Sequence, residues 1–175
     1  MIDKKVLGRE FFTRPAIKVA PDLLGKWLCV RLDDEVLRER IVETECYYGE
    51  EDTACHAHKG KTARTEVMYS EGGVTYVYLC YGIHSMLNFV TGHAGHPEAV
   101  LIRGVEGAIG PGRVTKYFSI SCKDNRQPLD SNYGIWVEDD GESSPKYKAL
   151  PRIGIDYARD KDRKRLWRFV VDSNA

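Results

Sequence analysis

The segment Arg40–His58, RIVETECYYGEEDTACHAH, holds the densest group of side chains able to do chemistry in this sequence. Residues two apart in a strand share a face, so we expect Glu43, Glu45 and Tyr47 to point the same way. A carboxylate beside an aromatic ring suits a pocket that holds a flat ring and activates a water molecule. The strand pattern alone instead favours a solvent-exposed face for both glutamates, because Asp and Glu side chains are usually exposed.

The same segment ends with Cys55, His56 and His58, which are residue types that bind zinc. A zinc site needs three or four ligands in a closed set, and the chain supplies no convincing remainder. His93 and His96 lie in a glycine-rich turn, where we expect them to be exposed to solvent. We therefore predict that the protein uses no metal and no cofactor. A metal-dependent hydrolase built on His56 and His58 is the disfavoured alternative.

Three tyrosines gather in the β-branched and aromatic run VTYVYLCY, a strong strand signal. Tyr76 and Tyr78 share one face of this strand, and Tyr81 falls at the turn that follows. One interpretation is a sheet core with an ordinary hairpin tip. The other is a stacking ring at Tyr78 and a wedge at Tyr81, because proteins that distort duplexes push bulky side chains between base steps.

Two polar residues interrupt apolar strands further along the chain, Asn88 in SMLNFV and Arg103 in AVLIRGV. Polar groups in such positions need partners if they are buried. Arg103 is therefore either one half of a structural ion pair or the group that holds a catalytic carboxylate.

Strand signals dominate the rest of the pattern, and the βαβ alternation of a doubly wound sheet is absent. We expect one mixed α+β domain over residues 1–175, with a mainly antiparallel β-sheet flanked by short helices. The polar segment 50–71 is predicted to be a long ordered loop, and 143–149 a surface loop. The predicted strands are 26–32, 36–48, 74–81, 84–91, 99–105, 134–137 and 167–171, and the predicted helical segments are 20–25 and 113–118.

The composition is that of an ordinary globular protein, because hydrophobic residues make up 42% and charged residues 30% of the 175 residues. Lys and Arg number 26 and Asp and Glu also number 26, so the net charge disfavours a simple basic protein that coats nucleic acid. The densest basic run is Arg159–Arg168, which we expect either to contact phosphates or to be a solvated surface.

Five scattered cysteines without a CxxC motif suit a reducing compartment, so we expect an intracellular protein, in the cytoplasm and nucleoid or in the nucleus of a eukaryote. No segment approaches the roughly 20 apolar residues that a membrane span needs. We also expect a monomer that does not bind membranes.

Taken together and in this order, these segments resemble the alkyladenine (3-methyladenine) DNA glycosylase family of base-excision repair. The combination of ETE-aromatic, D-x-A-x-H and YVY-x-x-YG is specific, and the matching pieces span nearly the whole chain. These pieces are LGREFF, LLGK, RIVETECYYGEEDTACH, YVYLCYG, MLN, LIRGVE, GPGRVTK, RIGI and WRFVV.

The resemblance implies a role for each matching residue. Glu45 would be the general base that activates the attacking water, and Arg103 and the main-chain carbonyl of Ile153 would help to hold that water. Rings that sandwich a flipped base, the backbone that reads its edge and a side chain that crowds the 2-amino group of guanine are also implied. The rings are those of Tyr47, His56 and Tyr78. The backbone is that around Ala54 and His56, and the crowding side chain is Asn88. Tyr81 would fill the gap in the duplex, and the expected DNA contacts also include Arg64, Met68, Arg113, Lys161, Arg163 and Lys164.

The function that the resemblance implies is a monofunctional purine DNA glycosylase. It would flip alkylated purines such as 3-methyladenine and 7-methylguanine, and also deaminated or etheno purines, out of double-stranded DNA and hydrolyse the N-glycosidic bond. No lysine falls in the matched pocket segments, so no strand cleavage through a Schiff base is expected.

Two departures from the family pattern concern affinity and substrate range. Only Gly-Ala-Ile separates Glu106 from Gly110, where family members usually carry a longer basic helical segment, and Thr65 follows Arg64, where Asn is common. The shortened segment motivates an alternative function, a DNA lesion-binding protein with weak or no excision activity.

Overall fold

Ten strands form the framework of the protein in a computed structural model that describes residues 4–173. The main path through the sheet runs β1-β8-β2-β3-β6-β5-β4, and β10 pairs with β3 and β9 while β7 pairs with β6. Every one of these pairings is antiparallel, which confirms the predicted fold class. The strands are β1 (Lys5–Val6), β2 (Trp27–Leu32), β3 (Glu35–Tyr48), β4 (Thr75–Cys80), β5 (His84–Val90), β6 (Glu98–Val105), β7 (Ala108–Ile109), β8 (Ile135–Asp139), β9 (Tyr147–Leu150) and β10 (Arg168–Val171).

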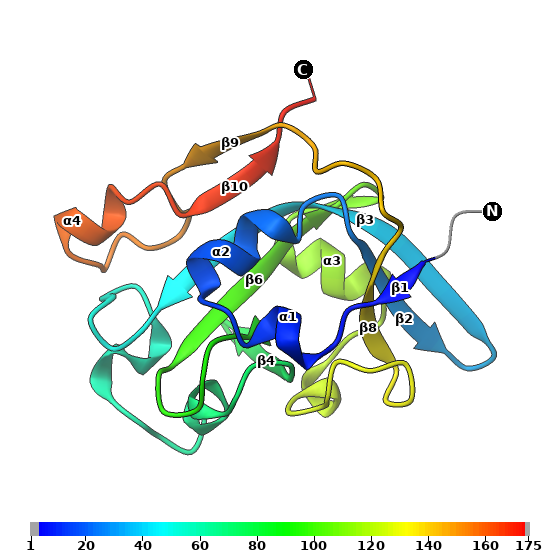
Figure 1. The fold of residues 1–175 in the computed structure, drawn as a ribbon. Coiled ribbons are helices and arrows are strands. Elements are labelled where there is room, and N and C mark those ends of the chain that lie inside the picture. Colours follow the sequence, from blue (N-terminus) through cyan, green and yellow to red (C-terminus); the bar gives the residue numbers. More distant parts are fainter. Residues whose placement is uncertain (1–3, 174–175) are drawn as a thin grey trace.

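Strand β3 is the longest strand and connects the two halves of the sheet (Figure 1). Its first half pairs with β2 through the turn at Asp33, and its second half lies between β6 and β10. The register between β3 and β6 shifts around Glu43, which indicates a β-bulge at this point. Because β6 and β10 pair with its two edges, the second half of β3 is a rigid place for a functional side chain.

Short helices cover the sheet. They are α1 (Arg9–Phe12), α2 (Ala16–Asp22), α3 (Pro111–Tyr117) and α4 (Asp160–Arg163), with 3₁₀ helices at His56–Lys59, Glu66–Tyr69 and Cys122–Asp124. The helix predicted at 20–25 was placed too late, because Pro15 fixes an extended backbone just before Ala16 and the helix begins there. Helix α3 begins at Pro111, in the first-turn position that proline favours, and so matches the predicted helix at 113–118 to within a few residues.

Helices α1, α2 and α3 all contribute buried apolar side chains to the main core, which packs against the sheet. The Phe12 ring packs edge-on against Phe89 with 5.7 Å between centroids, and the Thr44 hydroxyl donates a hydrogen bond to the Ala20 carbonyl at 2.8 Å. Burying each large apolar side chain contributes about 1.5–3 kcal/mol before entropy is counted. Because Thr44 faces this core, its neighbours Glu43 and Glu45 face the opposite side of β3.

Two loop predictions are changed by the structure. Residues 143–149 were expected to be a surface loop, but Tyr147–Leu150 forms β9, an exposed edge strand paired with β10. Tyr147, Lys148 and Ala149 are all exposed and give no alternating pattern of burial, so pairing rather than burial holds the strand in place. The long segment 50–71 is a loop interrupted by two 3₁₀ helices.

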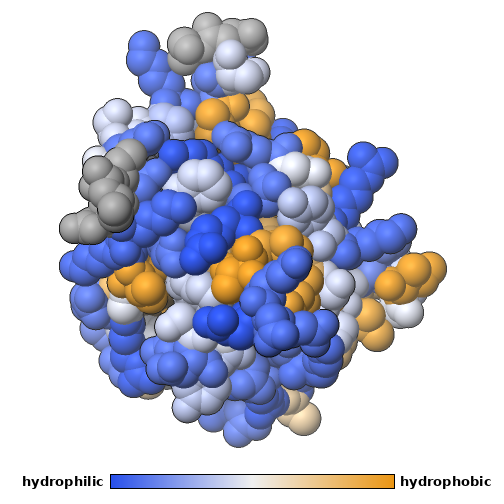
Figure 2. Space-filling model, turned by 90° about the vertical axis from the view of Figure 1, so that its right-hand side faces the viewer, coloured by the Kyte–Doolittle hydropathy of each residue, from blue (hydrophilic) through white to orange (hydrophobic). Residues whose placement is uncertain are grey.

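The surface in Figure 2 is mostly hydrophilic, with apolar atoms in small separate patches. Within residues 4–173, no helix is long and apolar enough to cross a membrane.

Candidate active site

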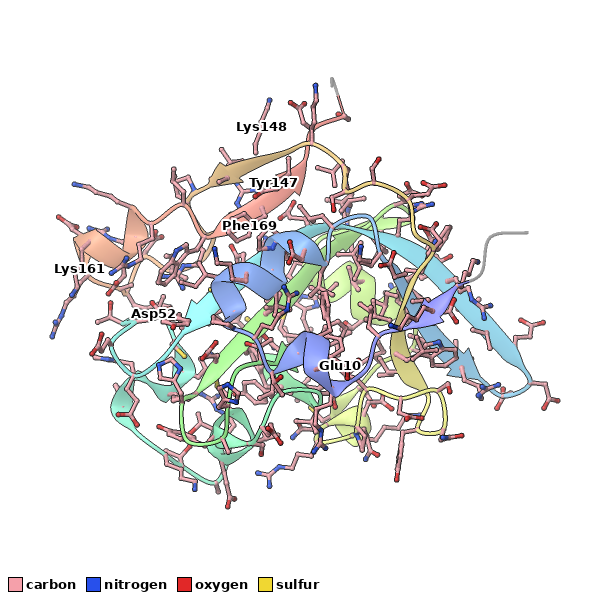
Figure 3. The ribbon with its side chains drawn as sticks, in the orientation of Figure 1. Glu10, Asp52, Tyr147, Lys148, Lys161 and Phe169 are labelled. Carbon is pink, nitrogen blue, oxygen red and sulfur yellow. The ribbon has the colours of Figure 1, made fainter. Side chains whose placement is uncertain are left out.

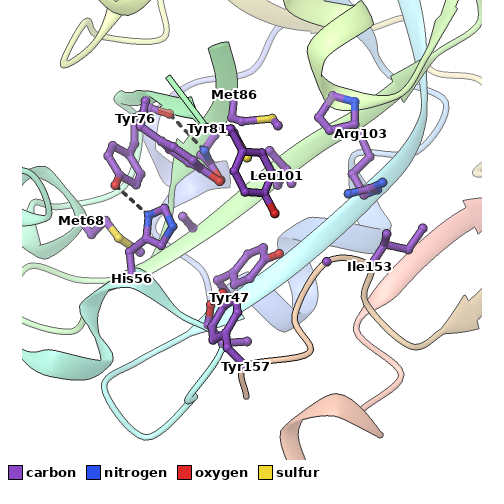
Figure 4. Close-up of a pocket in the computed structure, with 17 residues that line it drawn as sticks. Tyr47, His56, Met68, Tyr76, Tyr81, Met86, Leu101, Arg103, Ile153 and Tyr157 are labelled. Carbon is purple, nitrogen blue, oxygen red and sulfur yellow. Dashed lines mark hydrogen bonds between the residues drawn. The ribbon is translucent and has the colours of Figure 1, made fainter. Parts of the chain in front are cut away.

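A cavity of about 490 Å³ opens on the face of the sheet opposite helix α2. This volume is in the range of pockets that hold small molecules. Figure 4 shows side chains from several distant segments converging on it, with Tyr47 and Tyr157 on one side, His56 and Tyr76 on another, and Arg103 and Ile153 on a third. The lining residues are Tyr47, Ala54, His56, Met68, Tyr76, Tyr78, Cys80, Tyr81, Met86, Asn88, Ala99, Leu101, Arg103, Pro111, Ile153, Gly154 and Tyr157.

Glu45 is 0% exposed and is hydrogen-bonded to residues that line this cavity, so the solvent-exposed face favoured by the strand pattern is wrong. Its carboxylate accepts hydrogen bonds from the Tyr47 hydroxyl at 2.9 Å and the Ile153 main-chain N–H at 2.7 Å. Burial raises the pKa of Glu45, and the Arg103 guanidinium and these hydrogen bonds act in the opposite direction. The result is a desolvated carboxylate held in one orientation, as a general base requires.

Arg103 joins both glutamates of the ETE motif. Its Nε donates to Glu43 at 2.8 Å, and its Nη1 lies 3.5 Å from a Glu45 oxygen. The predicted common face of Glu43 and Glu45 is confirmed, because one guanidinium reaches both. Arg103 is thus a structural ion pair and a neighbour of the candidate base at the same time, which unites the two interpretations of its sequence position.

Aromatic rings form much of the cavity wall. The His56 ring packs against Tyr78 with 4.5 Å between centroids, and Tyr78 lies 5.2 Å from Tyr76. The His56 Nδ1 is hydrogen-bonded to the Tyr76 hydroxyl at 2.9 Å. Burial lowers the pKa of His56 to about 4, with a smaller contribution from Arg64 in the same direction, so the imidazole is neutral at physiological pH. A neutral ring presents a π face without a repelling charge to a cationic ligand.

The turn that carries Ala54 is fixed by buried charges. Asp52 accepts hydrogen bonds from the Ala54 N–H at 3.1 Å and from Arg152 at 2.6 and 2.9 Å. Arg152 also donates to the Cys46 carbonyl at 2.9 Å, and its guanidinium stacks over Tyr47. Because Arg152 directly precedes Ile153, one buried ion pair positions two walls of the cavity.

The other predicted base contacts also reach the cavity. Asn88 is buried and its amide donates to the Tyr76 carbonyl at 3.2 Å. Ile153 contributes its N–H to Glu45, whereas the resemblance implies a role for its carbonyl. Met68, expected as a DNA contact, is buried in the cavity wall, so any contact that it makes is with a group inside the cavity.

The remaining predicted DNA contacts lie on the surface. Tyr81 is 92% exposed at the tip of the β4–β5 hairpin, with a left-handed backbone (φ 53°), and also borders the cavity. Arg64 and Arg113 are exposed, and Lys161 points outward from α4 (Figure 3). Arg163 and Lys164 are exposed as well. Arg163 is paired with Asp160, which reduces its free positive charge.

The histidines and cysteines considered as metal ligands are dispersed. His58 contacts the Glu50 carbonyl, while His93 and His96 are exposed as predicted. Within the described residues, no three His, Cys, Asp or Glu side chains lie together as a metal site requires.

Sequence reasoning missed three contributors to the site. Asp52 and Arg152 form its buried ion pair, and Tyr157 lines the cavity and donates its hydroxyl to the Ala54 carbonyl at 2.7 Å. For Arg152, the sequence signal was a charged residue next to the apolar Ile153 in RIGI. Tyr157 offered none, because a lone aromatic in a polar segment resembles a surface residue.

Comparison with known proteins shows which family the amino-acid sequence belongs to. The family model described as Methylpurine-DNA glycosylase (MPG) matches residues 10–108 and 105–175. Relatives named "Putative 3-methyladenine DNA glycosylase" occur in Psychrobacter cryohalolentis (46% identity, 89% of this chain and 87% of the relative) and Methanocella arvoryzae (44%, 97% and 94%). A relative with the same name in Borreliella afzelii is 39% identical over 96% of this chain and 97% of its own. Extending over nearly the whole chain, these similarities show that it belongs to the methylpurine-DNA glycosylase family.

Proposed function

We propose that this protein is a purine DNA glycosylase that releases alkylated bases from double-stranded DNA. The observation that carries the proposal is the buried carboxylate of Glu45, which contacts Tyr47, Arg103 and Ile153 in the lining of an aromatic cavity. The substrates we propose are 3-methyladenine and 7-methylguanine, together with deaminated and etheno purines. We further propose that the protein acts as a monomer inside the cell.

A base must leave the duplex to reach this cavity, at a cost of a few kcal/mol. Stacking on the rings of Tyr47, His56 and Tyr78 contributes about 1–3 kcal/mol per base and offsets that cost. A cationic alkylated purine gains further from the electron-rich ring faces. Tyr81, exposed at the hairpin tip, would occupy the space that the flipped nucleotide leaves between its neighbours.

The chemical step follows from the position of Glu45. Its carboxylate takes a proton from water, the water oxygen bonds to C1′ of the deoxyribose, and the bond from C1′ to the purine nitrogen breaks. The electron pair of that bond leaves with the base, and a cationic alkylated purine departs neutral. Proton transfer of this kind contributes about 10²–10⁴-fold to the rate. The negative charge of Glu45 also stabilises positive charge that develops on the sugar.

We propose no strand cleavage. A Schiff base with the sugar requires an amine nucleophile, and no lysine occurs among the described residues that line the cavity. The expected result is that borohydride traps no covalent adduct between the protein and lesion-containing DNA. Recovery of such an adduct would contradict this part of the proposal.

The test compares wild type with Glu45→Gln in single-turnover base release from duplexes that carry each candidate lesion. We expect Glu45→Gln to bind lesion DNA as tightly as wild type and to lose excision by about 10²-fold or more. Glu35→Gln, the same change at an exposed position of β3, should behave as wild type. Base release by Glu45→Gln at the wild-type rate would overturn the assignment.

The same panel separates the alternative function. Tight lesion binding by wild type without release of any base would identify a lesion-binding protein instead of an enzyme. In the structure, the shortened segment after Glu106 forms β7, which pairs back onto β6 as a hairpin at the surface. Strand β7 itself contributes none of the described residues that line the cavity, which favours the enzyme.

A further inference from the structure

Glu43 is the other buried carboxylate of the ETE motif, and it contacts two arginines. It accepts the Arg103 Nε–H at 2.8 Å, and Arg168 Nη1 lies 3.7 Å from the same carboxylate oxygen. Only 9% of Glu43 is exposed, so these contacts are shielded from solvent. Desolvating a carboxylate is costly, and the two guanidinium groups offset that cost through ion pairing.

The contacts of Glu43 close a ring around the candidate base. Arg168 Nε donates to the Pro151 carbonyl at 2.9 Å, and Pro151 lies two residues before Ile153. The Ile153 N–H donates to Glu45, and Glu45 faces Arg103. Strands β3, β6 and β10 and the 151–153 loop are thereby joined through polar contacts.

Two distances within this ring differ in a way that matters for chemistry. Arg103 lies 2.8 Å from Glu43 but 3.5 Å from Glu45, although the Glu45 carboxylate is the more deeply buried. Without a competitor, a buried guanidinium and a buried carboxylate would close to a direct ion pair. A base engaged in such a pair is weaker, because the arginine stabilises its ionised form.

We propose that Glu43 is a positioning residue that holds Arg103 back from Glu45, so that the Glu45 carboxylate stays free to take a proton from water. This inference rests on the proposed function only in naming water as the proton donor. The spacing of the three side chains is a property of the fold and can be measured without substrate.

The charged and titratable groups around Glu45 come from several elements. Arg103 faces it from β6, Arg152 from the 151–153 loop, and Tyr47 from β3 itself. Tyr78 of β4 and Tyr157 also lie close enough to interact with it electrostatically, and Arg168 pairs opposite it on β10. Among the carboxylates, Glu43 shares Arg103 directly with Glu45.

The experiment is a pH–rate profile of single-turnover base release for wild type, Glu43→Gln, Glu43→Asp and Glu35→Gln. Glu43→Gln keeps an acceptor for Arg103 but removes the charge. We expect its plateau rate to fall about tenfold or more, and its acidic limb to move about one pH unit lower, because Arg103 approaches Glu45. Glu43→Asp should keep the limb near wild type, and Glu35→Gln should match wild type throughout.

Lesion binding and the unfolding midpoint are measured on the same four proteins, because a merely structural role would lower the midpoint without moving the acidic limb. A Glu43→Gln limb that stays in place or moves to higher pH would overturn the inference. So would an unchanged plateau rate.

If wild type itself releases no base, the proposed function fails, and the inference about Glu43 is then tested separately. The probe is the ¹³Cδ signal of Glu45, titrated by NMR in wild type and in Glu43→Gln. A lower pKa of Glu45 in the variant supports the positioning role. An equal or higher pKa refutes it.

Discussion

Replacing Arg152 with Met tests whether one buried ion pair holds two walls of the cavity together. The side chain of Arg152 is 0% exposed and lies between the rings of Tyr47 and Trp167, 4.9 and 5.0 Å from their centroids. Met preserves much of the apolar packing but removes the charge and the donors. Asp52 would then keep only the main-chain N–H groups of Tyr48 and Ala54 as partners at this site.

The expected cost follows from that stranded charge. Removing one partner of a buried ion pair destabilises a protein by about 3–5 kcal/mol. In a chain of this length, about 2–4 °C is lost per kcal/mol, so the unfolding midpoint of Arg152→Met should fall by on the order of 10 °C. The Asp52→Asn/Arg152→Met double variant should recover part of the loss, because no unpaired charge stays buried.

Urea unfolding followed by circular dichroism measures these free energies, and Arg9→Met provides the matched control. Arg9 pairs with Glu71 at 3.6 Å on the surface, where an ion pair is worth about 0–1 kcal/mol. If Arg152→Met costs no more than Arg9→Met, or if the double variant is no more stable than the single one, the reasoning about the buried pair is wrong.

Three further predictions concern the site. Glu45→Gln should raise the unfolding midpoint at pH 7–8, because the raised pKa of Glu45 means that its ionised form destabilises the fold. This gain in the midpoint should vanish as the pH falls through that pKa. As the pH falls from 6.5 to about 4, wild type should lose about 3 kcal/mol of stability that His56→Phe keeps, because His56 binds a proton in the unfolded chain but not in the folded protein. Urea titrations that show the same loss of stability in acid for both proteins would contradict this. Tyr81→Ala should leave the midpoint unchanged and weaken lesion binding in duplexes about tenfold, measured by fluorescence anisotropy, with a smaller effect on single strands.

Much of the fold could be predicted because local pattern and tertiary structure agree. The strands expected at 26–32 and 36–48 occur at Trp27–Leu32 and Glu35–Tyr48, where apolar, β-branched and aromatic residues are frequent. Strand β9 could not be predicted, since exposed residues of an edge strand carry no periodic signal. The start of α2 was missed because the proline within it, Pro21, drew the predicted boundary toward the wrong end.

The site could be predicted by residue type but not by environment. Glu45 was singled out as a candidate base, yet its burial depends on Arg103 and Ile153, which lie 58 and 108 residues away along the chain. The pairing of Arg103 with Glu43 likewise arises from the packing of β3 against β6. Spacing within one segment contains no information about such partners, so the strand pattern alone favoured exposure.

The position of β10 beside β3 determines when the surroundings of Glu45 can be completed during synthesis of the chain. Glu45 and Tyr47 leave the ribosome early, but the Ile153 N–H and the Arg168 side chain that complete their surroundings come more than 100 residues later. A nascent chain that stops before Pro151 would contain the aromatic cavity residues from Tyr47 to Tyr81. It would still lack the Ile153 N–H that binds the Glu45 carboxylate. We therefore expect a fragment that ends before Pro151 to release no base, because it lacks the contacts that Ile153 and Arg168 make around Glu45.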